Sequence, residues 1–377
     1  MNHIFISHHH GNEVSGYKHT GPVYDNGYVD TLQEITDYSL LKVVPGDDGF
    51  HLTDPVIGNF EWWYFDITDI QNNILLKIVA HIGTNPLKTR IFPQLAFSVI
   101  TPEINENFTR AYAFDDFKGS TEKCQIQLKN EFEVRAEHHT QTEYFIMVNV
   151  PGYSAELHFT NEIEGWKPSG NRVRYRKAGR SADFMWIIPS PKAKVDGYFV
   201  YKGRRYNVQH ATGYHDHNYC SVQKERPLHL DSLVKKWYWG KCYCEDYTLI
   251  FMDTFFRTKR LRSLFVARKD EIIHSSNNLA SLKIENSGYD AALQTAYPSS
   301  LSVSLKEDAV SLKVFIESVK IIDKRDLLEG VPSLLKWMIK KFIVKPVYFG
   351  LFSKALLEMD GKITKGFGNY EYMAFRT

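Results

Sequence analysis

The sequence has little cysteine, no marked excess of charge of either sign and no long uninterrupted hydrophobic run. Its 377 residues include four cysteines, too few for a disulfide scaffold, and 46 Lys and Arg residues against 44 Asp and Glu residues leave a net charge of +2. This balance excludes the basic surface typical of nucleic-acid-binding proteins, so we expect no nucleic-acid partner. The N-terminus lacks the pattern of a secretory signal peptide, and we expect a cytoplasmic protein.

The common catalytic signatures are also missing. The chain contains no G-x-S-x-G, no P-loop, no G-x-G-x-x-G after a strand and no H-E-x-x-H. These absences argue against the usual nucleophilic, nucleotide-dependent and zinc-peptidase chemistries, and we expect no cofactor.

What the chain has in abundance is aromatic residues, at 14%, and short alternating segments. In residues 124–136 apolar and polar side chains alternate with a period of two, which indicates a strand with one buried face. Similar short runs occur at 143–150, 153–163, 182–188, 195–201, 205–212, 237–256, 261–268, 301–306, 309–321 and 367–375. Many short strands without helical crossovers predict an all-β protein made of antiparallel barrels or sandwiches.

The chain divides into an N-terminal arm and two domains. Residues 1–45 show little periodicity and are expected to form an N-terminal arm. Residues 221–233 lack alternation and contain Pro227, which is typical of a linker between two β units. We therefore predict a first domain over 46–222 and a second domain over 223–377.

Residues 326–358 interrupt the β pattern. Apolar side chains recur there at helical spacing, with lysines on much of the remaining surface, and Pro346 and Gly350 precede a second short helix. The sequence predicts a C-terminal amphipathic helical insertion that either packs over one end of a barrel or contacts a membrane surface through 331–352. The lysines exclude an ordinary spanning helix. The oligomeric state is not predicted.

The segment EWWYFD places Glu61 and Trp63 on one face of a strand and Trp62 and Tyr64 on the other. A carboxylate beside two tryptophans is costly to bury. Glu61 is therefore either a hydrogen-bonded structural acceptor or a functional group with a raised pKa. The opposite, aromatic face could line a cavity.

The segment GYHDHNYC places His215 and His217 on one strand face and Asp216 and Asn218 on the other. Three interpretations are open. The two histidines could bind zinc, with a thiolate from Cys220, Cys242 or Cys244. Asp216 could transfer a proton without any metal, or the polar groups could form a buried structural network.

These two motifs, followed by WYWG at 237–240, resemble the hydroxyneurosporene synthase and AttH-like family, the carotenoid 1,2-hydratase superfamily. FMWIIPSPKAKVDGYF at 184–199 and GFGNYEYMAF at 366–375 are similar too, so the resemblance covers about residues 50–375. The family pattern usually reads HDHNWG, whereas this chain has Tyr219 and Cys220 at the last two positions. The resemblance implies two consecutive lipocalin-like domains, with Glu61 and Asp216 approaching each other near an interdomain cavity.

The resemblance, whose distant members include fungal Diels–Alderases, also implies acid-initiated hydration or cyclisation of an apolar polyene or isoprenoid chain between the domains. A protonated Asp216 would deliver a proton to a C=C bond, although an adjacent imidazolium would oppose the neutral form of its carboxyl. Asp216, His215, His217 and Glu61 are the catalytic candidates. The substrate-binding candidates are Trp62, Trp63, Tyr64, Tyr214, Asn218, Trp237 and Trp239.

Two other functions compete with this interpretation. A lipocalin-like cavity could simply carry a hydrophobic small molecule, in which case Asp216 would be dispensable. A zinc-dependent enzyme would instead use His215 and His217 as ligands. All three hypotheses share an apolar or small-molecule ligand as the partner.

Overall fold

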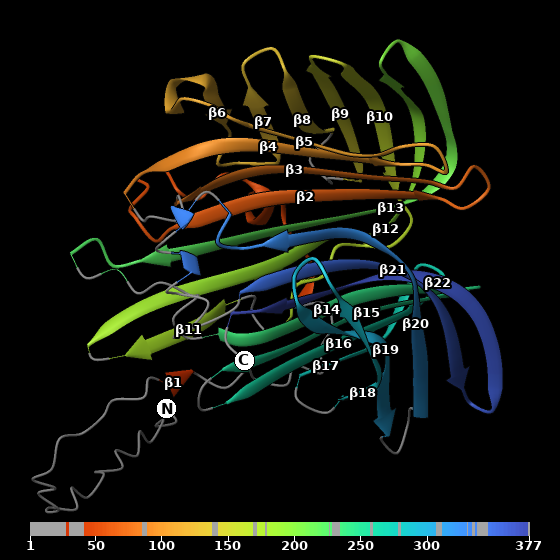
Figure 1. Cartoon of the computed structure of the whole chain (residues 1–377). Helices are drawn as coiled ribbons and strands as arrows, with labels where there is room; N and C mark the ends of the chain where they lie inside the picture. The colour runs from red at the N-terminus through yellow and green to blue at the C-terminus, as the bar shows by residue number, and fades with distance from the viewer. Residues whose placement is uncertain are drawn as a thin grey trace, which may run out of the picture.

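The computed structural model consists almost wholly of β-strands in two antiparallel sheets (Figure 1), as the alternation predicts. The structure describes residues 28–29, 41–84, 89–137, 142–168, 172–177, 179–225, 227, 234–256, 259–277, 280–306, 311–329, 331–333, 336–337 and 346–375. Nearly all of the expected N-terminal arm lies outside these residues.

The first sheet runs in the order β5-β4-β3-β2-β13-β12-β10-β9-β8-β7-β6, and β11 joins β1 to β12. Every pair is antiparallel, and most neighbours in the sheet are also neighbours in the chain. The strands are β1 (Tyr28–Val29), β2 (Phe60–Asp69), β3 (Ile74–Thr84), β4 (Ile91–Ile100), β5 (Asn105–Ala111), β6 (Phe117–Gly119), β7 (Gln125–Leu128), β8 (Phe132–Glu137), β9 (Glu143–Val150), β10 (Tyr153–Asn161), β11 (Arg172–Lys177), β12 (Arg180–Tyr201) and β13 (Arg204–Val222).

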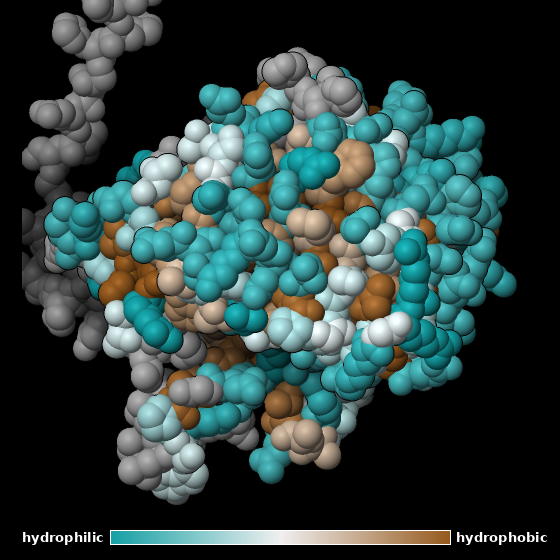
Figure 2. Space-filling model, turned by 90° about the horizontal axis from the view of Figure 1, so that it is seen from above, coloured by the Kyte–Doolittle hydropathy of each residue, from teal (hydrophilic) through white to brown (hydrophobic). Residues whose placement is uncertain are grey.

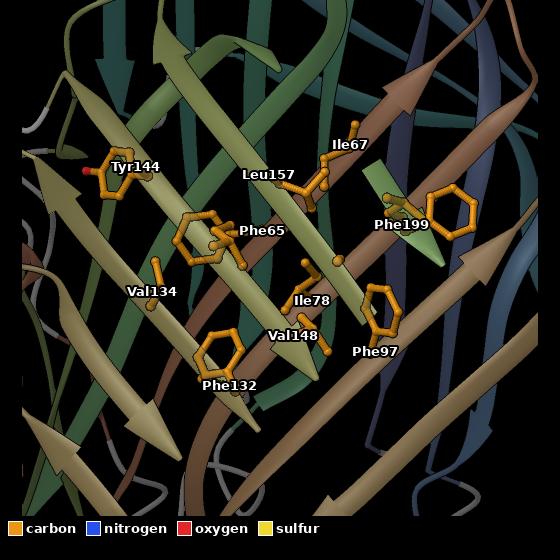
Figure 3. Packing of buried hydrophobic residues seen from close by; sticks show 14 of the residues in the cluster. Phe65, Ile67, Ile78, Phe97, Phe132, Val134, Tyr144, Val148, Leu157 and Phe199 are labelled. Atoms are coloured by element: carbon orange, nitrogen blue, oxygen red, sulfur yellow. The ribbon is translucent and has the colours of Figure 1, made fainter. Parts of the chain in front are cut away.

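One face of this sheet curls around a hydrophobic core. The single strand expected over 124–136 is instead a hairpin of β7 and β8, because the chain turns at Lys129. Its alternating apolar side chains point into the core as expected, and Phe132 and Val134 are fully buried. Figure 3 shows Phe65 and Phe97 from the early strands meeting Leu157 from β10 in the same cluster. Strands from both ends of the sheet share one core, so the sheet is curled rather than flat.

The second sheet runs in the order β17-β16-β15-β14-β22-β21-β20-β19-β18. The chain passes from the first sheet to the second between Val222 and Val234. The strands are β14 (Val234–Cys244), β15 (Tyr247–Phe256), β16 (Arg260–Arg268), β17 (Glu271–Asn277), β18 (Ser281–Asp290), β19 (Thr295–Lys306), β20 (Ser311–Asp326), β21 (Val347–Met359) and β22 (Lys362–Ala374).

The two sheets pack against each other through a separate layer of side chains. Trp186 and Tyr214 from the first sheet belong to the same buried cluster as Trp239 and Phe265 from the second. This layer is distinct from the core of each sheet. We call it the inter-sheet seam.

The predicted helical insertion is wrong in its C-terminal part. Residues 347–358 belong to β21, which pairs with β20 and β22 along its length, because their alternating burial suits a sheet with one covered face. Ser333, Lys336 and Trp337 are helical, with the Lys336 amide donating to the Pro332 carbonyl, and the rest of 330–345 lies largely outside the described residues. Predicted membrane contact through 331–352 stays a prediction.

The described part of the chain has no helix long and apolar enough to cross a membrane. The face seen in Figure 2 is largely hydrophilic, and its hydrophobic areas are broken up by hydrophilic residues. No extended apolar surface therefore shows on that face.

Candidate active site

Strands β2 and β13 carry both sequence motifs and lie side by side in the first sheet. Their antiparallel register places Trp63 opposite His217 and Tyr64 opposite Asp216. Since directly paired residues share a face and neighbours along a strand alternate, each motif divides into an inward half and a seam half.

The inward half is a network of buried acids and imidazoles. His217 Nε2 lies 2.9 Å from Glu61 Oε1, and His217 Nδ1 lies 3.4 Å from Asp48 Oδ1. Glu61 also accepts hydrogen bonds from the backbone amides of His51 (2.9 Å) and Leu52 (3.0 Å). The buried carboxylate of Glu61 therefore has the hydrogen-bond donors that it needs, and the loop after the short helix η2 (Pro45–Asp48) supplies two of them.

Asp48 joins the two histidines. His215 Nε2 lies 3.1 Å from Asp48 Oδ2, while His215 Nδ1 lies 2.9 Å from the carbonyl oxygen of Tyr64. The Tyr144 hydroxyl donates to Asp48 Oδ2 at 3.0 Å. Asp48, His215 and His217 are fully buried.

Electrostatic attraction between the carboxylates and the imidazoles determines which groups of this network are ionised. Burial alone would raise the pKa of Asp48, but His215 and His217 lower it to about 2. Burial opposes protonation of His217, yet the neighbouring carboxylates of Asp48 and Glu61 raise its pKa to about 9. With its pKa raised to about 9, His217 is an imidazolium between two carboxylates at neutral pH, so the three groups stabilise one another's charges.

The arrangement does not bring together the zinc ligands expected from the sequence. The described residues offer two groups of three closely spaced donors, Asp48 with Cys124 and His215, and His51 with Glu61 and His217. The two histidines of the motif thus belong to different groups. The three cysteines considered as zinc ligands pack in other clusters, Cys220 in the seam and Cys242 and Cys244 in the second core.

The seam half contains Asp216, which is 6% exposed. Its Oδ2 accepts a hydrogen bond from the Tyr214 hydroxyl (2.9 Å) and its Oδ1 one from Asn218 Nδ2 (2.9 Å). Burial and the nearby Glu371 raise the pKa of Asp216 to about 7, although the bonds from Tyr214 and Trp186 and the charge of Lys241 favour the carboxylate. A large fraction of Asp216 is accordingly neutral near pH 7.

This geometry removes the objection that an imidazolium beside Asp216 would keep it ionised. His215 and His217 point into the first core, on the other face of β13. It also corrects the expectation that Glu61 and Asp216 approach each other, because Glu61 lies on the inward face with His217. Cys220 causes no backbone strain, since it is not among the described residues with positive φ.

The surroundings of Asp216 are aromatic and partly unsatisfied. Tyr64 and Trp239 lie 6.0 Å apart edge to face, and the Lys241 ammonium lies 4.0 Å from the Tyr214 ring centroid while it pairs with Asp66. Two buried polar atoms of this region, Asn218 Oδ1 and Trp239 Nε1, have no hydrogen-bond partner, and neither has Trp237 Nε1, which lies further along the seam against Phe184. Such atoms are costly unless water or a ligand satisfies them.

The structure therefore divides the candidates of the sequence into two groups. Asp216, Asn218, Tyr214, Tyr64, Trp237 and Trp239 lie at the seam, whereas His215, His217, Glu61 and Trp63 face the first core. Trp62 lies on the seam face of β2, stacked on Phe60 with 4.8 Å between ring centroids.

Sequence reasoning missed several contributors. Lys241, fully buried in the apolar C-terminal part of β14, could have been found as a lone charge in the hydrophobic run WYWGKCYC. Glu371, in GFGNYEYMAF, carried the same signal. No sequence signal pointed to Asp48, because it lies in the turn-like sequence PGDD, outside any periodic segment.

Comparisons with known proteins agree with this architecture. The model of the Svf1 family matches residues 68–372. The quinolone epoxide rearrangement protein asqO of Emericella nidulans is 25% identical over 291 residues, which cover 70% of this chain and 74% of that protein.

Three solved structures share the fold. An AttH protein from Nitrosomonas europaea has a TM-score of 0.60 at 13% identity, covering 88% of this chain and 96% of that one. CghA with Sch210972 has a TM-score of 0.61 at 9% identity, covering 92% and 98%. Kievitone hydratase from Nectria haematococca has a TM-score of 0.54 at 12% identity, covering 89% and 99%. The fold expected from the resemblance is confirmed.

Proposed function

The chain belongs to the Svf1 family, and from this membership and the geometry of the seam we propose that it is a cofactor-independent enzyme that uses Asp216 as a general acid. The substrate is an apolar unsaturated molecule of polyene or isoprenoid type bound between the sheets. The names of similar proteins, an epoxide rearrangement protein and a hydratase, support chemistry of this general kind.

The observation that carries the proposal is that the Asp216 carboxyl is buried beside the unsatisfied Asn218 Oδ1 and Trp239 Nε1, where burial raises its pKa to about 7. A general acid works best when its pKa lies near the operating pH, and a value of about 7 meets this condition. A half turn of the Asn218 amide would let its unpaired Oδ1 accept the proton of neutral Asp216, so the pair can hold either protonation state.

The proposed reaction begins with transfer of the Asp216 proton to one carbon of a C=C bond. A C–H bond forms, the π bond breaks, and the resulting cation lies against the rings of Tyr64 and Trp239. In a hydration, water adds to the cation and loses a proton to the Asp216 carboxylate. In a cyclisation, a second alkene of the substrate adds instead, and the carboxylate removes the final proton.

A substrate can reach Asp216 only if the seam opens locally, because the carboxyl is almost completely buried. Tyr214 and Trp239 close over it, with ring centroids 5.3 Å apart. Trp239 Nε1 and Asn218 Oδ1 have no hydrogen-bond partner in this layer, so a ligand that supplies the missing hydrogen bonds favours its rearrangement.

The test is product analysis by mass spectrometry after incubation with polyenes and isoprenoids in ¹⁸O-labelled water. Hydration gives a product that is heavier by one labelled water, and cyclisation gives an isomer of the substrate. We expect Asp216→Asn to lower the rate by about 10²–10⁴-fold, whereas Asp196→Asn, outside the seam, serves as the matched control. Retention of an unchanged ligand by both variants would instead identify a carrier.

A further inference from the structure

A groove opens at the outer end of the seam, between β2–β4 of the first sheet and β20–β22 of the second. Its volume is about 690 Å³, within the range of about 300–1,000 Å³ typical of small-molecule sites. Both sheets contribute apolar side chains to its walls, chiefly Ile70, Leu75, Ile100, Val319, Phe352 and Phe367. Two apolar side chains at the groove are exposed, Ile70 just after β2 at 46% and Val319 in the middle of β20 at 48%.

The groove is separate from the Asp216 site. Thr68 lines it, and Thr68 follows Asp66 and Tyr64 on the same face of β2. Tyr64 pairs with Asp216, so the rise of about 3.3 Å per residue puts the groove about 13 Å further along the strand. The buried ion pair of Lys241 with Asp66 stands between the two places.

Three lysines line this groove, and all are exposed. Lys320 comes from β20, Lys354 from β21 and Lys365 from β22. None forms an ion pair with the described residues. Asp69, the acidic residue in the lining, is buried and already accepts hydrogen bonds from the backbone and side chain of Asn72. The groove therefore combines apolar walls with three lysines whose positive charge is only partly offset, by the Asp69 carboxylate in the lining and by Glu317, which lies opposite Lys354 in the sheet.

We propose that this groove binds a single-chain anionic amphiphile, an apolar tail that carries one carboxylate or phosphate. The tail lies along the apolar walls, where its burial is favourable, and the head lies among Lys320, Lys354 and Lys365. The proposal does not depend on catalysis by Asp216.

The probes are monomeric dodecanoate and dodecyl phosphate, with dodecanol as the uncharged compound of equal tail length. Isothermal titration calorimetry of the full chain is expected to show tighter binding of both anions than of the alcohol. Shortening the carboxylate from twelve carbons to ten should weaken binding by roughly fourfold for each methylene that leaves the groove.

Charge reversal tests the lysines. Lys354→Glu with Lys365→Glu is expected to weaken dodecanoate binding by roughly tenfold, with little effect on dodecanol. Lys306→Glu with Lys313→Glu is the matched control, since it makes the same charge change on β19 and β20 outside the groove. Leu75→Trp should fill the apolar wall and reduce the binding of every probe.

Three results would overturn the proposal. Equal losses in the two lysine double variants would mean that only overall charge matters. Binding to vesicles of anionic phospholipid without binding to monomeric dodecanoate would assign the lysines to a lipid surface. Loss of dodecanoate binding in Asp216→Asn, with full binding by Lys354→Glu with Lys365→Glu, would place the amphiphile at Asp216 instead.

Discussion

The two faces of β13 place similar polar residues in opposite environments. On the inward face, His217 lies between two carboxylates, and every charge has a compensating neighbour. On the seam face, Asp216 is buried with neutral donors, and its pKa rises to about 7. A stretch of four consecutive polar residues thus contains a structural ion cluster and a candidate acid, separated by one strand thickness.

The difference shows what burial does to a titratable group. A buried carboxyl that lies beside imidazoles stays ionised. Asp48 is an example, because His215 and His217 lower its pKa to about 2 in spite of its burial. Without an imidazolium on its own face, the same burial keeps a carboxyl protonated into the neutral range. A buried acid with raised pKa stores unfavourable energy, which is typical of functional sites.

Removing one member from each face should give opposite changes in stability. His217→Ala leaves the buried carboxylates of Asp48 and Glu61 without their cation, and we expect a loss of about 3–5 kcal/mol in the free energy of unfolding at pH 7. Asp216→Asn keeps the shape of the side chain and removes a desolvated acid. It should stabilise the protein at pH 8 by a few kcal/mol, since each pKa unit corresponds to about 1.4 kcal/mol.

Urea denaturation of the two variants and the wild type measures both changes. Asp196→Asn, on the exposed part of β12, should alter the free energy of unfolding much less than either variant. Destabilisation by Asp216→Asn as large as that by His217→Ala would show that both faces are structural, and the comparison would fail.

The two faces also predict how stability depends on pH. The pKa of His217 is raised from 6.5 to about 9, so its stabilisation is complete below about pH 6.5 and is lost as the pH rises through 9. The pKa of Asp216 is raised from 3.8 to about 7, so the wild type should lose stability relative to Asp216→Asn between pH 4 and 7. Thermal unfolding from pH 4 to 10 separates the two windows, and a constant difference between wild type and Asp216→Asn would refute the second.

Substitutions of neighbouring residues should shift the pKa of Asp216 without removing its carboxyl. Glu371→Gln takes away a charge that raises the pKa of Asp216, so the fall of activity with pH should shift to lower pH. Tyr214→Phe removes a hydrogen bond that favours the carboxylate, so the shift should go to higher pH. Rate profiles of both variants check the signs, and shifts in the same direction would contradict the assigned environment.

Much of the fold follows from the sequence because strand signals are local. The alternation at 124–136 predicted which side chains of β7 and β8 are buried. The same period of two predicted that Asp216 lies on the opposite strand face from His215 and His217. What periodicity cannot give is which elements meet. Asp48 reaches the histidines across 167 residues of chain, and Lys241 reaches Asp66 across 175.

The error at 347–358 has a partly similar cause. Lys354 and Glu358 interrupt an apolar segment in a way that suits either a helix or a strand with one exposed face. Pairing decides between them, with β20 across the segment 327–346 and with β22 across the two-residue turn Asp360-Gly361. Asp-Gly is a typical hairpin turn, and this local signal for a strand was overlooked.

The most direct test is an infrared titration of Asp216 in the intact protein. The difference between the spectra of wild type and Asp216→Asn isolates the C=O band of the protonated carboxyl. A band present at pH 5 that disappears with a midpoint near 7 is expected from the burial of this residue and its separation from the histidines. A carboxyl already ionised at pH 5 would contradict its role as a general acid.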